Sequence, residues 1–145
     1  MKEIIESFKK YTGLADIGRP EEDEINKALK VNKESDGNEL ANALLVLSNY
    51  YIYLKYEFAQ VNARVAYMRE ELNKGILPAA AKHKSYDREE RKFAVLENAD
   101  ESWQQLQSTI EAEKIKLDLL GPVIEGIKIK VDALRTIIER KRYGN

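Results

Sequence analysis

Apolar residues recur from Leu40 to Leu72 at alternating steps of four and three, with no Pro or Gly between them. This repeat is typical of a long helix with one apolar seam, a single line of apolar side chains along its length. At 1.5 Å per residue such a helix would be roughly 50 Å long, so it needs a packing partner of similar length. The seam comprises Leu40, Leu44, Leu47, Tyr51, Leu54, Phe58, Val61, Val65, Met68 and Leu72.

Local signals mark the two ends of this first long helix. Asn38 is a suitable N-cap, because its side chain can accept a hydrogen bond from a free amide of the first turn. Lys74 followed by Gly75 predicts an end near Asn73, since a cation suits the negative end of a helix and Gly can take a positive φ. Pro78 argues against simple continuation. The sequence thus predicts a helix from about Asn38 to Asn73.

A second seam predicts a second long helix, which starts near Ser85 or Asp87 and reaches Ile138. Gly121-Pro122 predicts a kink, or a split in which Pro122 begins a third helix, because Pro removes an amide and clashes one turn back. The second seam, broken only by its glutamate, comprises Phe93, Leu96, Ala99, Trp103, Leu106, Ile110, Glu113, Leu117, Leu120, Ile124, Ile127, Val131, Leu134 and Ile138.

The first 37 residues have a different character. They predict a short N-terminal helix with an apolar side, from Ile4 to Tyr11, followed by a polar, acidic arm. Ile25, Ala28 and Leu29 offer at most two turns of weak helix in this arm, so we expect it to be loosely held. The predicted organisation is an arm over residues 1–37 and a helical assembly and binding domain over residues 38–145.

The expected fold class is all-α, with two long heptad-patterned helices in a helical bundle. Packing of the two helices within one chain could bury both seams, but seams of this length also join helices of different chains. Ile115, Leu119, Val123, Ile129 and Ile137 lie outside the second seam and widen its apolar stripe beyond what one partner helix covers. We therefore expect a homo-oligomer that assembles through Trp103, Ile110, Leu117, Leu120, Ile124, Ile127, Val131, Leu134 and Ile138.

Glu113 provides a test of that assembly seam. A glutamate buried in an apolar oligomer interface should resist ionisation, which means a raised pKa. The substitution Glu113→Leu should then tighten the oligomer.

Composition limits the classes of function. The chain has 145 residues, of which 43% are hydrophobic and 34% charged, with a net charge of −1 and no Cys. These values fit one mostly helical domain and exclude disulfides and thiolate chemistry. No apolar run is long enough for a membrane span, and residues 1–10 lack the pattern of a signal peptide. We expect a cytoplasmic protein without a membrane partner.

Catalytic chemistry has little support in the sequence. His83 is the single His, and it lies in a Lys-rich connector where a solvated side chain is the usual state. No carboxylate cluster pairs with it to form a metal site, and neither a P-loop nor a dinucleotide-binding glycine motif occurs. We expect no enzymatic activity, no cofactor and no metal.

A basic and aromatic block surrounds the connector between the two long helices. Phosphates require Lys and Arg on one surface, and single strands also use exposed aromatic rings. The plain alternative is that Glu70, Glu71, Glu89 and Glu90 neutralise these cations in local pairs. The candidate nucleic-acid-binding residues are Arg64, Tyr67, Lys74, Lys82, Lys84, Arg88, Arg91 and Lys92.

Two short segments resemble a known family. Ala63-Arg64-x-x-Tyr67 ahead of the connector and Asp87-x-x-Glu90 at the opening of the next helix resemble the UvsY-like family of phage recombination mediators, over about residues 50–140. The resemblance implies an all-helical subunit that assembles into a ring and binds single-stranded DNA in the host cytoplasm. It also implies two protein partners, a recombinase that is loaded and a single-strand-binding protein that covers the strand.

The resemblance assigns the DNA contact to Arg64. Asn62 stands where the family has a lysine, so Lys74, Lys82 and Lys84 would have to compensate. The sequence therefore supports two hypotheses: a single-stranded-DNA-binding recombination mediator without enzymatic activity, or a helical adaptor or inhibitor that binds another protein through its long helices. Charge reversal at Arg64, Lys82 and Lys84 would separate them, since only the first predicts lost DNA binding.

Overall fold

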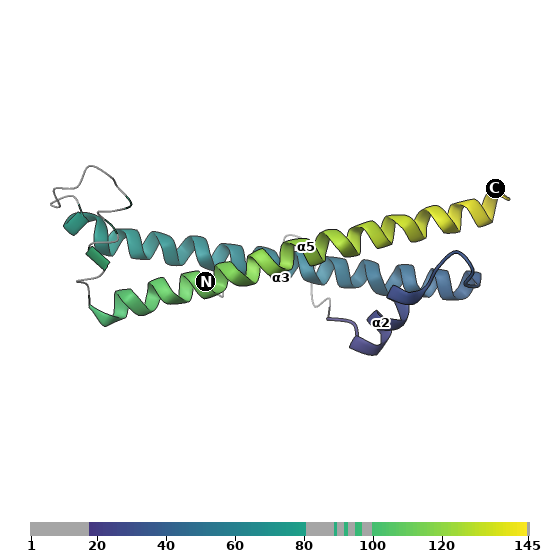
Figure 1. Ribbon diagram of the computed structural model, residues 1–145, viewed down its shortest axis with the longest axis horizontal. Coiled ribbons are helices and arrows are strands. Elements are labelled where there is room, and N and C mark those ends of the chain that lie inside the picture. The colour runs from purple at the N-terminus through teal and green to yellow at the C-terminus, as the bar shows by residue number, and fades with distance from the viewer. Residues whose placement is uncertain (1–17, 81–88, 90–91, 93–94, 97–99, 145) are drawn as a thin grey trace. The chain divides into compact units, whose positions relative to one another are not determined.

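The computed structural model describes residues 18–80, 89, 92, 95–96 and 100–144, and these residues form an all-α fold without strands. The helices are α2 (Glu22–Lys30), α3 (Gly37–Ala80) and α5 (Glu101–Tyr143), labelled in Figure 1. The expected all-α class is confirmed. The predicted N-terminal helix from Ile4 to Tyr11 lies outside the described residues.

The chain divides into two compact units. The first unit combines the residues up to Ala59 with Leu119–Asn145, and the second unit is Gln60–Asp118. Each unit contains a part of α3 and a part of α5, so the two seams meet within one chain in both units.

The first unit has a core made by three helices. Leu40 and Leu47 of α3 and Leu134 of α5 are fully buried in it. Residues of the predicted assembly seam complete this core: Ile124, Ile127 and Val131 are buried, and Leu120 and Ile138 pack against them. Burial of these side chains is the dominant stabilising term for such a helix pair.

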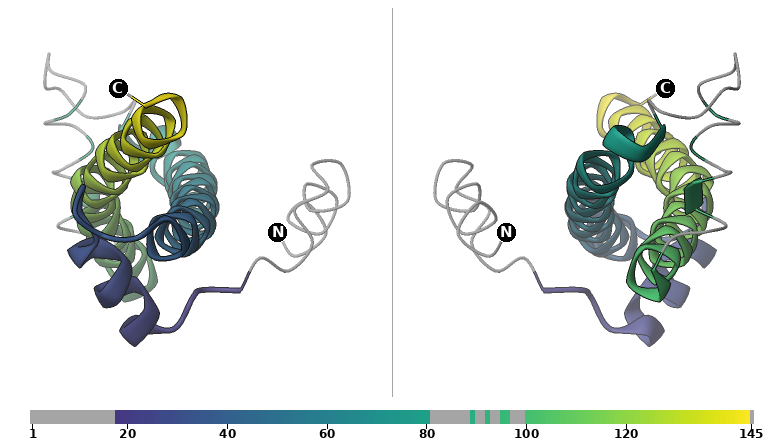
Figure 2. Two further views of the ribbon diagram at one scale, coloured as in Figure 1. Left: turned by 90° about the vertical axis from the view of Figure 1, so that its right-hand side faces the viewer. Right: turned by 90° about the vertical axis from the view of Figure 1, so that its left-hand side faces the viewer.

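Helix α2 belongs to this core and is not a loosely held segment. It has nine residues and lies beside α3 and α5 (Figure 2). Its Ile25 and Ala28 are buried in the core that these two helices share. The link from α2 to α3 is also fastened to α5, because Lys130 Nζ donates a hydrogen bond of 2.6 Å to the carbonyl of Val31. The expectation of a loose arm was wrong for this part of the chain, since two apolar residues at the helical spacing of three suffice to hold it.

Helix α3 begins at Gly37, and its N-cap is Asp36, two residues before the predicted Asn38. The Asp36 carboxylate accepts a 2.8 Å hydrogen bond from the Glu39 amide, and Glu39 accepts a 3.3 Å bond from the Asp36 amide. This reciprocal arrangement is a capping box, which satisfies two backbone donors at once. The pairing explains why Asp36 takes precedence over Asn38.

Helix α3 also ends later than predicted. It passes through Gly75 and Pro78 and stops at Ala80, so the predicted end near Asn73 was wrong. Ile76 is buried in the core of the second unit, and that burial outweighs the weak end signal of Gly75. Pro78 lies within α3, which therefore lacks the helical hydrogen bond that the amide of this residue would otherwise donate.

Helix α5 begins at Glu101. The predicted start of the second long helix near Ser85 or Asp87 lies outside the described ranges, and the described residues that follow, 89, 92, 95 and 96, are helical, so the predicted helix is interrupted at Asp100. Asp100 is not helical, and its carbonyl accepts the amides of Trp103 and Gln104. The helix then continues through Pro122 to Tyr143, so the predicted alternative of a split at Gly121-Pro122 was wrong.

The core of the second unit is smaller. Val61, Val65, Leu72 and Ile76 of α3 and Ile110 of α5 are buried in it. Residues partly buried against this core are Met68, Val95, Leu96, Trp103, Leu106 and Leu117. Trp103, Ile110 and Leu117 of the predicted assembly seam are thus in contact with their own chain.

Candidate nucleic-acid interface

Four of the eight predicted nucleic-acid-binding residues are described, and all four belong to the second unit. They are Arg64, Tyr67 and Lys74 on α3, and Lys92. The remaining four predicted residues lie outside the described part of the chain: Lys82, Lys84, Arg88 and Arg91.

Arg64 is held by Glu113 of α5. Its Nη2 lies 3.1 Å from Glu113 Oε2, and Lys116 Nζ lies 2.7 Å from Glu113 Oε1. The Arg64 side chain is 39% exposed and that of Glu113 only 14%. Glu113 therefore interrupts the seam because it takes part in an ion pair across the two helices.

This ion pair reverses the expectation for the ionisation of Glu113. The hydrogen bond from Lys116 lowers the pKa of the Glu113 carboxyl most; burial opposes the change, and the hydrogen bond from Arg64 adds to it. The net direction is down, so Glu113 is more readily ionised than an ordinary glutamate. The predicted raised pKa was wrong, because the seam position has two cations within hydrogen-bond reach.

Lys74 is likewise engaged locally. Its Nζ lies 3.2 Å from a Glu70 oxygen and 3.6 Å from a Glu71 oxygen. The hydrogen bond to Glu70 is the largest cause that raises the pKa of Lys74. Glu70 and Glu71 thus pair locally with Lys74, which was the alternative to nucleic-acid binding for this cation.

The predicted cationic face divides along α3. Successive residues of a helix are about 100° apart, so Arg64 lies on one side of the buried stripe that contains Val65 and Leu72, and Tyr67 and Lys74 lie further round toward the face opposite that stripe. We call the side of Arg64 the Arg64 flank. Arg69 lies on the other side, the Arg69 flank, where α3 faces a cavity.

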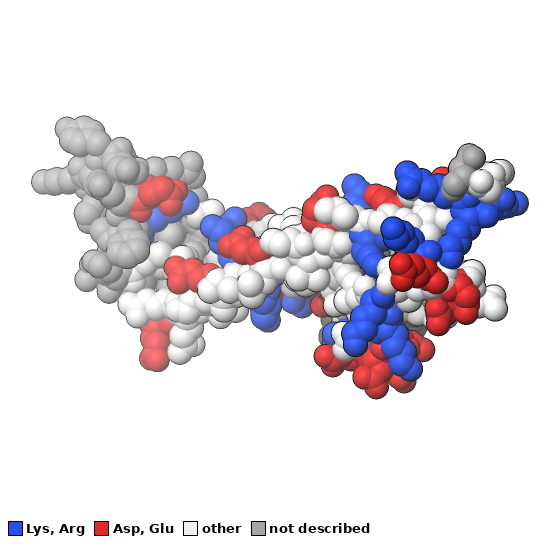
Figure 3. Space-filling view, turned by 45° about the vertical axis from the view of Figure 1, so that its right-hand side comes forward, with Lys and Arg blue, Asp and Glu red and all other residues white. Residues whose placement is uncertain are grey.

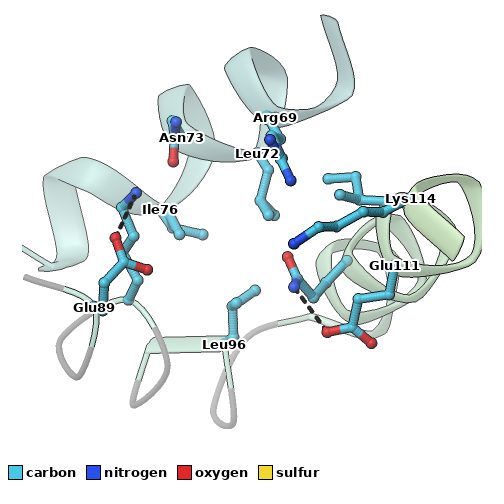
Figure 4. A pocket seen from close by; sticks show the side chains of 11 residues that line it. Arg69, Leu72, Asn73, Ile76, Glu89, Leu96, Glu111 and Lys114 are labelled. Atoms are coloured by element: carbon cyan, nitrogen blue, oxygen red, sulfur yellow. Dashed lines mark hydrogen bonds and ion pairs between the residues drawn. The ribbon is translucent and has the colours of Figure 1, made fainter. Parts of the chain in front are cut away.

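The cavity on the Arg69 flank has a volume of about 460 Å³, within the range of ordinary ligand pockets. Its floor is apolar, formed by the buried Leu72, Ile76 and Ile110 together with Leu96 (Figure 4). The polar residues that line it are Arg69, Asn73, Glu89, Lys92, Gln107, Glu111 and Lys114.

The charges around this cavity are unequally matched. Arg69 from α3 and Lys114 from α5 point into it, and neither makes a hydrogen bond or ion pair with another described residue (Figure 4). The acidic groups are engaged: Glu89 lies 3.6 Å from Lys92 Nζ, and Glu111 accepts a 3.0 Å hydrogen bond from Gln107. Two cations above an apolar floor can bind an anionic group attached to an apolar or aromatic body.

Lys92 is the only predicted residue that lines the cavity, and sequence reasoning missed the other two cations as a pair. Arg69 follows Val65 by four and precedes Leu72 by three, and Lys114 stands in the same relation to Ile110 and Leu117. This shared spacing places each cation at the edge of a seam. It was a usable signal, but it does not reveal that the two edges face each other.

The first unit has a cationic region of its own. Figure 3 shows Lys and Arg gathered at the C-terminal end of α5, where Arg140, Lys141 and Arg142 follow one another. Lys141 Nζ donates to the carbonyl of Ser35, and the Arg19 guanidinium lies 5.9 Å from the centre of the Tyr50 ring. Lys141 of this region and Arg19 therefore each have a structural contact within the unit.

Within the described ranges, no group of three or more His, Cys, Asp or Glu side chains is placed to hold a metal ion, and His83 lies outside those ranges. None of α2, α3 and α5, as far as they are described, has a stretch long and apolar enough to cross a lipid bilayer.

No protein family, curated protein or solved structure matches this chain. The likeness of residues 63–67 and 87–90 to recombination mediators therefore stays an expectation from sequence.

Proposed function

We propose that the chain binds single-stranded DNA without catalysis, through the cavity on the Arg69 flank of the second unit. The observation that carries this proposal is the pair of inward-pointing cations, Arg69 and Lys114, which have no partner among the described residues. The proposal keeps the predicted ligand but moves the main contact from Arg64 to the opposite flank.

The cavity suits a nucleotide of a single strand better than a duplex. A phosphate accepts charge-assisted hydrogen bonds from a guanidinium and an ammonium, which are stronger than those between neutral groups. An unstacked base can then turn toward the apolar floor of Leu72, Ile76 and Ile110. Bases of a duplex are stacked and paired, so reaching this floor would first cost the energy of flipping them out.

We infer a role as a recombination mediator from the sequence resemblance together with this binding mode. Two cations per cavity make a weak site, but several copies on one strand gain affinity because each later site binds a strand that is already held. The partners in this role are single-stranded DNA, a recombinase and a single-strand-binding protein. The chain itself would act as a homo-oligomer.

Fluorescence anisotropy of a labelled oligo-dT strand, titrated at low and at physiological salt beside the matching duplex, tests the proposal. The double variant Arg69→Glu/Lys114→Glu should weaken single-strand binding by roughly tenfold or more, since two phosphate contacts become repulsive. Lys55→Glu/Lys128→Glu is the matched control, because it makes the same change in net charge at two exposed residues of the first unit. Circular dichroism should show unchanged helix content in both.

Arg64 separates the proposal from the family-based assignment. If the Arg64 flank carries the contact, Arg64→Gln should weaken binding as much as Lys114→Gln does. We expect a much smaller effect, because the Arg64 guanidinium is already engaged by Glu113. Equal loss in the two double variants, or no binding by the unmodified chain at either salt, would reject the DNA proposal and favour the helical adaptor that binds another protein.

A further inference from the structure

Helix α5 carries a second apolar face in the first unit, separate from its buried one. Leu119, Val123 and Ile129 are 67%, 46% and 62% exposed, although each is a large apolar residue. Ile124 and Val131, which are buried in the core, lie on the other side of the helix. Neither α2 nor α3 covers the exposed face, so the helix pair leaves it open to a further partner.

The exposed face has its own heptad spacing. Leu119, Pro122, Gly126, Ile129 and Ala133 follow one another at steps of three and four, the spacing of a coiled-coil seam. A Cβ added at Gly126 would have no atom of its own chain within 4 Å. A second helix can therefore approach closely there without a clash.

The charges beside this face favour one orientation of a partner helix. Glu125 and Asp132, seven residues apart, form one edge, and Lys130 lies on the other edge. In a parallel pair of α5 helices, each Glu125 would face the partner's Lys130, five residues further along. An antiparallel pair would bring two acidic edges together, which is unfavourable.

Lys130 is able to take part in such a pairing. Its Nζ donates one hydrogen bond, to the carbonyl of Val31. An ammonium group has three donors, so two remain for a carboxylate of a partner.

We propose that a second copy of this chain docks on the exposed face of α5, with the two α5 helices parallel and each seam residue facing its own equivalent. The proposal differs from the assembly expected from sequence, whose seam residues are occupied in the core of their own chain. It does not depend on DNA binding, because the cavity belongs to the other unit.

Single cysteines test the surface and the orientation together, because the chain has none of its own. Leu119→Cys and Ala133→Cys, as separate variants of the full chain, should each form a disulfide with its own copy under mild oxidation. Leu119 and Ala133 both lie at seam positions, where the same residue of two parallel helices is close enough to its copy for a disulfide. Lys128→Cys, exposed on another side of α5, is the control and should stay unlinked.

Mass measurement by light scattering completes the test. The unmodified chain should have twice the mass of one subunit at micromolar concentration. The Ile129→Glu variant should have the mass of one subunit, with unchanged helix content. A disulfide that forms only when the Leu119→Cys and Ala133→Cys variants are mixed would reject the parallel orientation. A monomeric unmodified chain would overturn the proposal. This holds even if the face were then found to bind residues 1–17 or another protein.

Discussion

Arg64 and Glu113 are 49 residues apart in the sequence and are joined by an N–O distance of 3.1 Å. The contact ties α3 to α5 in the second unit and gives the one acidic residue of the second seam a partner. It also engages one nitrogen of the Arg64 guanidinium and neutralises part of its charge, which weakens the attraction of this side chain for a phosphate. A residue that the sequence indicated for DNA binding thus has a structural contact.

The first prediction concerns the contribution of Glu113 to stability. Glu113→Gln should lower the free energy of unfolding at pH 7 by about 0.5 kcal/mol, a modest value because Arg64 is partly exposed to solvent. Since the pKa of Glu113 is lower in the folded chain than in the unfolded one, its contribution is complete above the unfolded value and is lost as the pH falls through the folded value. Urea unfolding of both proteins should show the full difference at pH 7 and a progressively smaller one as the pH is lowered toward 3.

The control is Glu111→Gln, which removes the same charge from an exposed position of the same helix. Its effect at pH 7 should be smaller. If Glu113→Gln instead raised the stability, burial of the charged carboxylate would destabilise the folded chain, as the sequence alone suggested.

The second prediction concerns the start of α3. Asp36→Ala should lower the free energy of unfolding by about 1 kcal/mol, because it removes the N-cap and half of the capping box. Asn38→Ala is a matched control, since Asn38 is exposed and lies within the first turn. A larger loss for the Asn38 variant in urea titrations would restore Asn38 as the cap.

The seams were predictable because burial follows a local spacing. Leu40, Leu47 and Leu134 were assigned from their heptad steps, and each is fully buried. Helix ends are decided by weaker effects, on the order of 1 kcal/mol for a cap or a glycine. The burial of Ile76 is large enough to carry α3 past Gly75, which no local signal could reveal.

The candidate site was less predictable than the fold. The pairing of Arg64 with Glu113, and the convergence of Arg69 with Lys114, depend on how α3 and α5 are aligned in the second unit. Heptad spacing identifies the face of each helix but not the register between two helices. The sequence therefore indicated Arg64 as part of one basic block, whereas the structure pairs Arg64 with Glu113 and brings Arg69 and Lys114 together at a cavity.

The third prediction concerns the contact between Gly75 and Trp103. A Cβ built on Gly75 would collide with the outer atoms of the Trp103 indole ring. Gly75→Ala should therefore destabilise the second unit by about 1 to 3 kcal/mol, although alanine is the better helix former. Trp103 is the single Trp of the chain, so its fluorescence during urea unfolding reports on this unit.

Gly126→Ala is the opposite case. Nothing in its own chain is within 4 Å of a Cβ at Gly126, so this variant should gain up to about 1 kcal/mol at a concentration where the chain is monomeric.

A Trp103→Phe background tests whether the indole ring causes the loss in Gly75→Ala. Followed by circular dichroism, this loss should shrink in that background, because the smaller ring does not reach as far. An equal loss in both backgrounds would mean that Trp103 is not the cause.

The last prediction separates a phosphate contact from a general charge effect. Single-strand binding weakens with salt because each phosphate contact releases counterions, with a slope of about 0.7 per contact in a plot of log K against log salt. If Lys114 contacts a phosphate, Lys114→Gln should lower the magnitude of that slope by about 0.7. Lys128→Gln, which removes an equal charge from the first unit, should leave the slope unchanged. An equal change in both variants would mean that DNA binding depends only on the net charge of the chain. A weaker affinity with an unchanged slope would mean that Lys114 maintains the shape of the cavity and does not contact the phosphate.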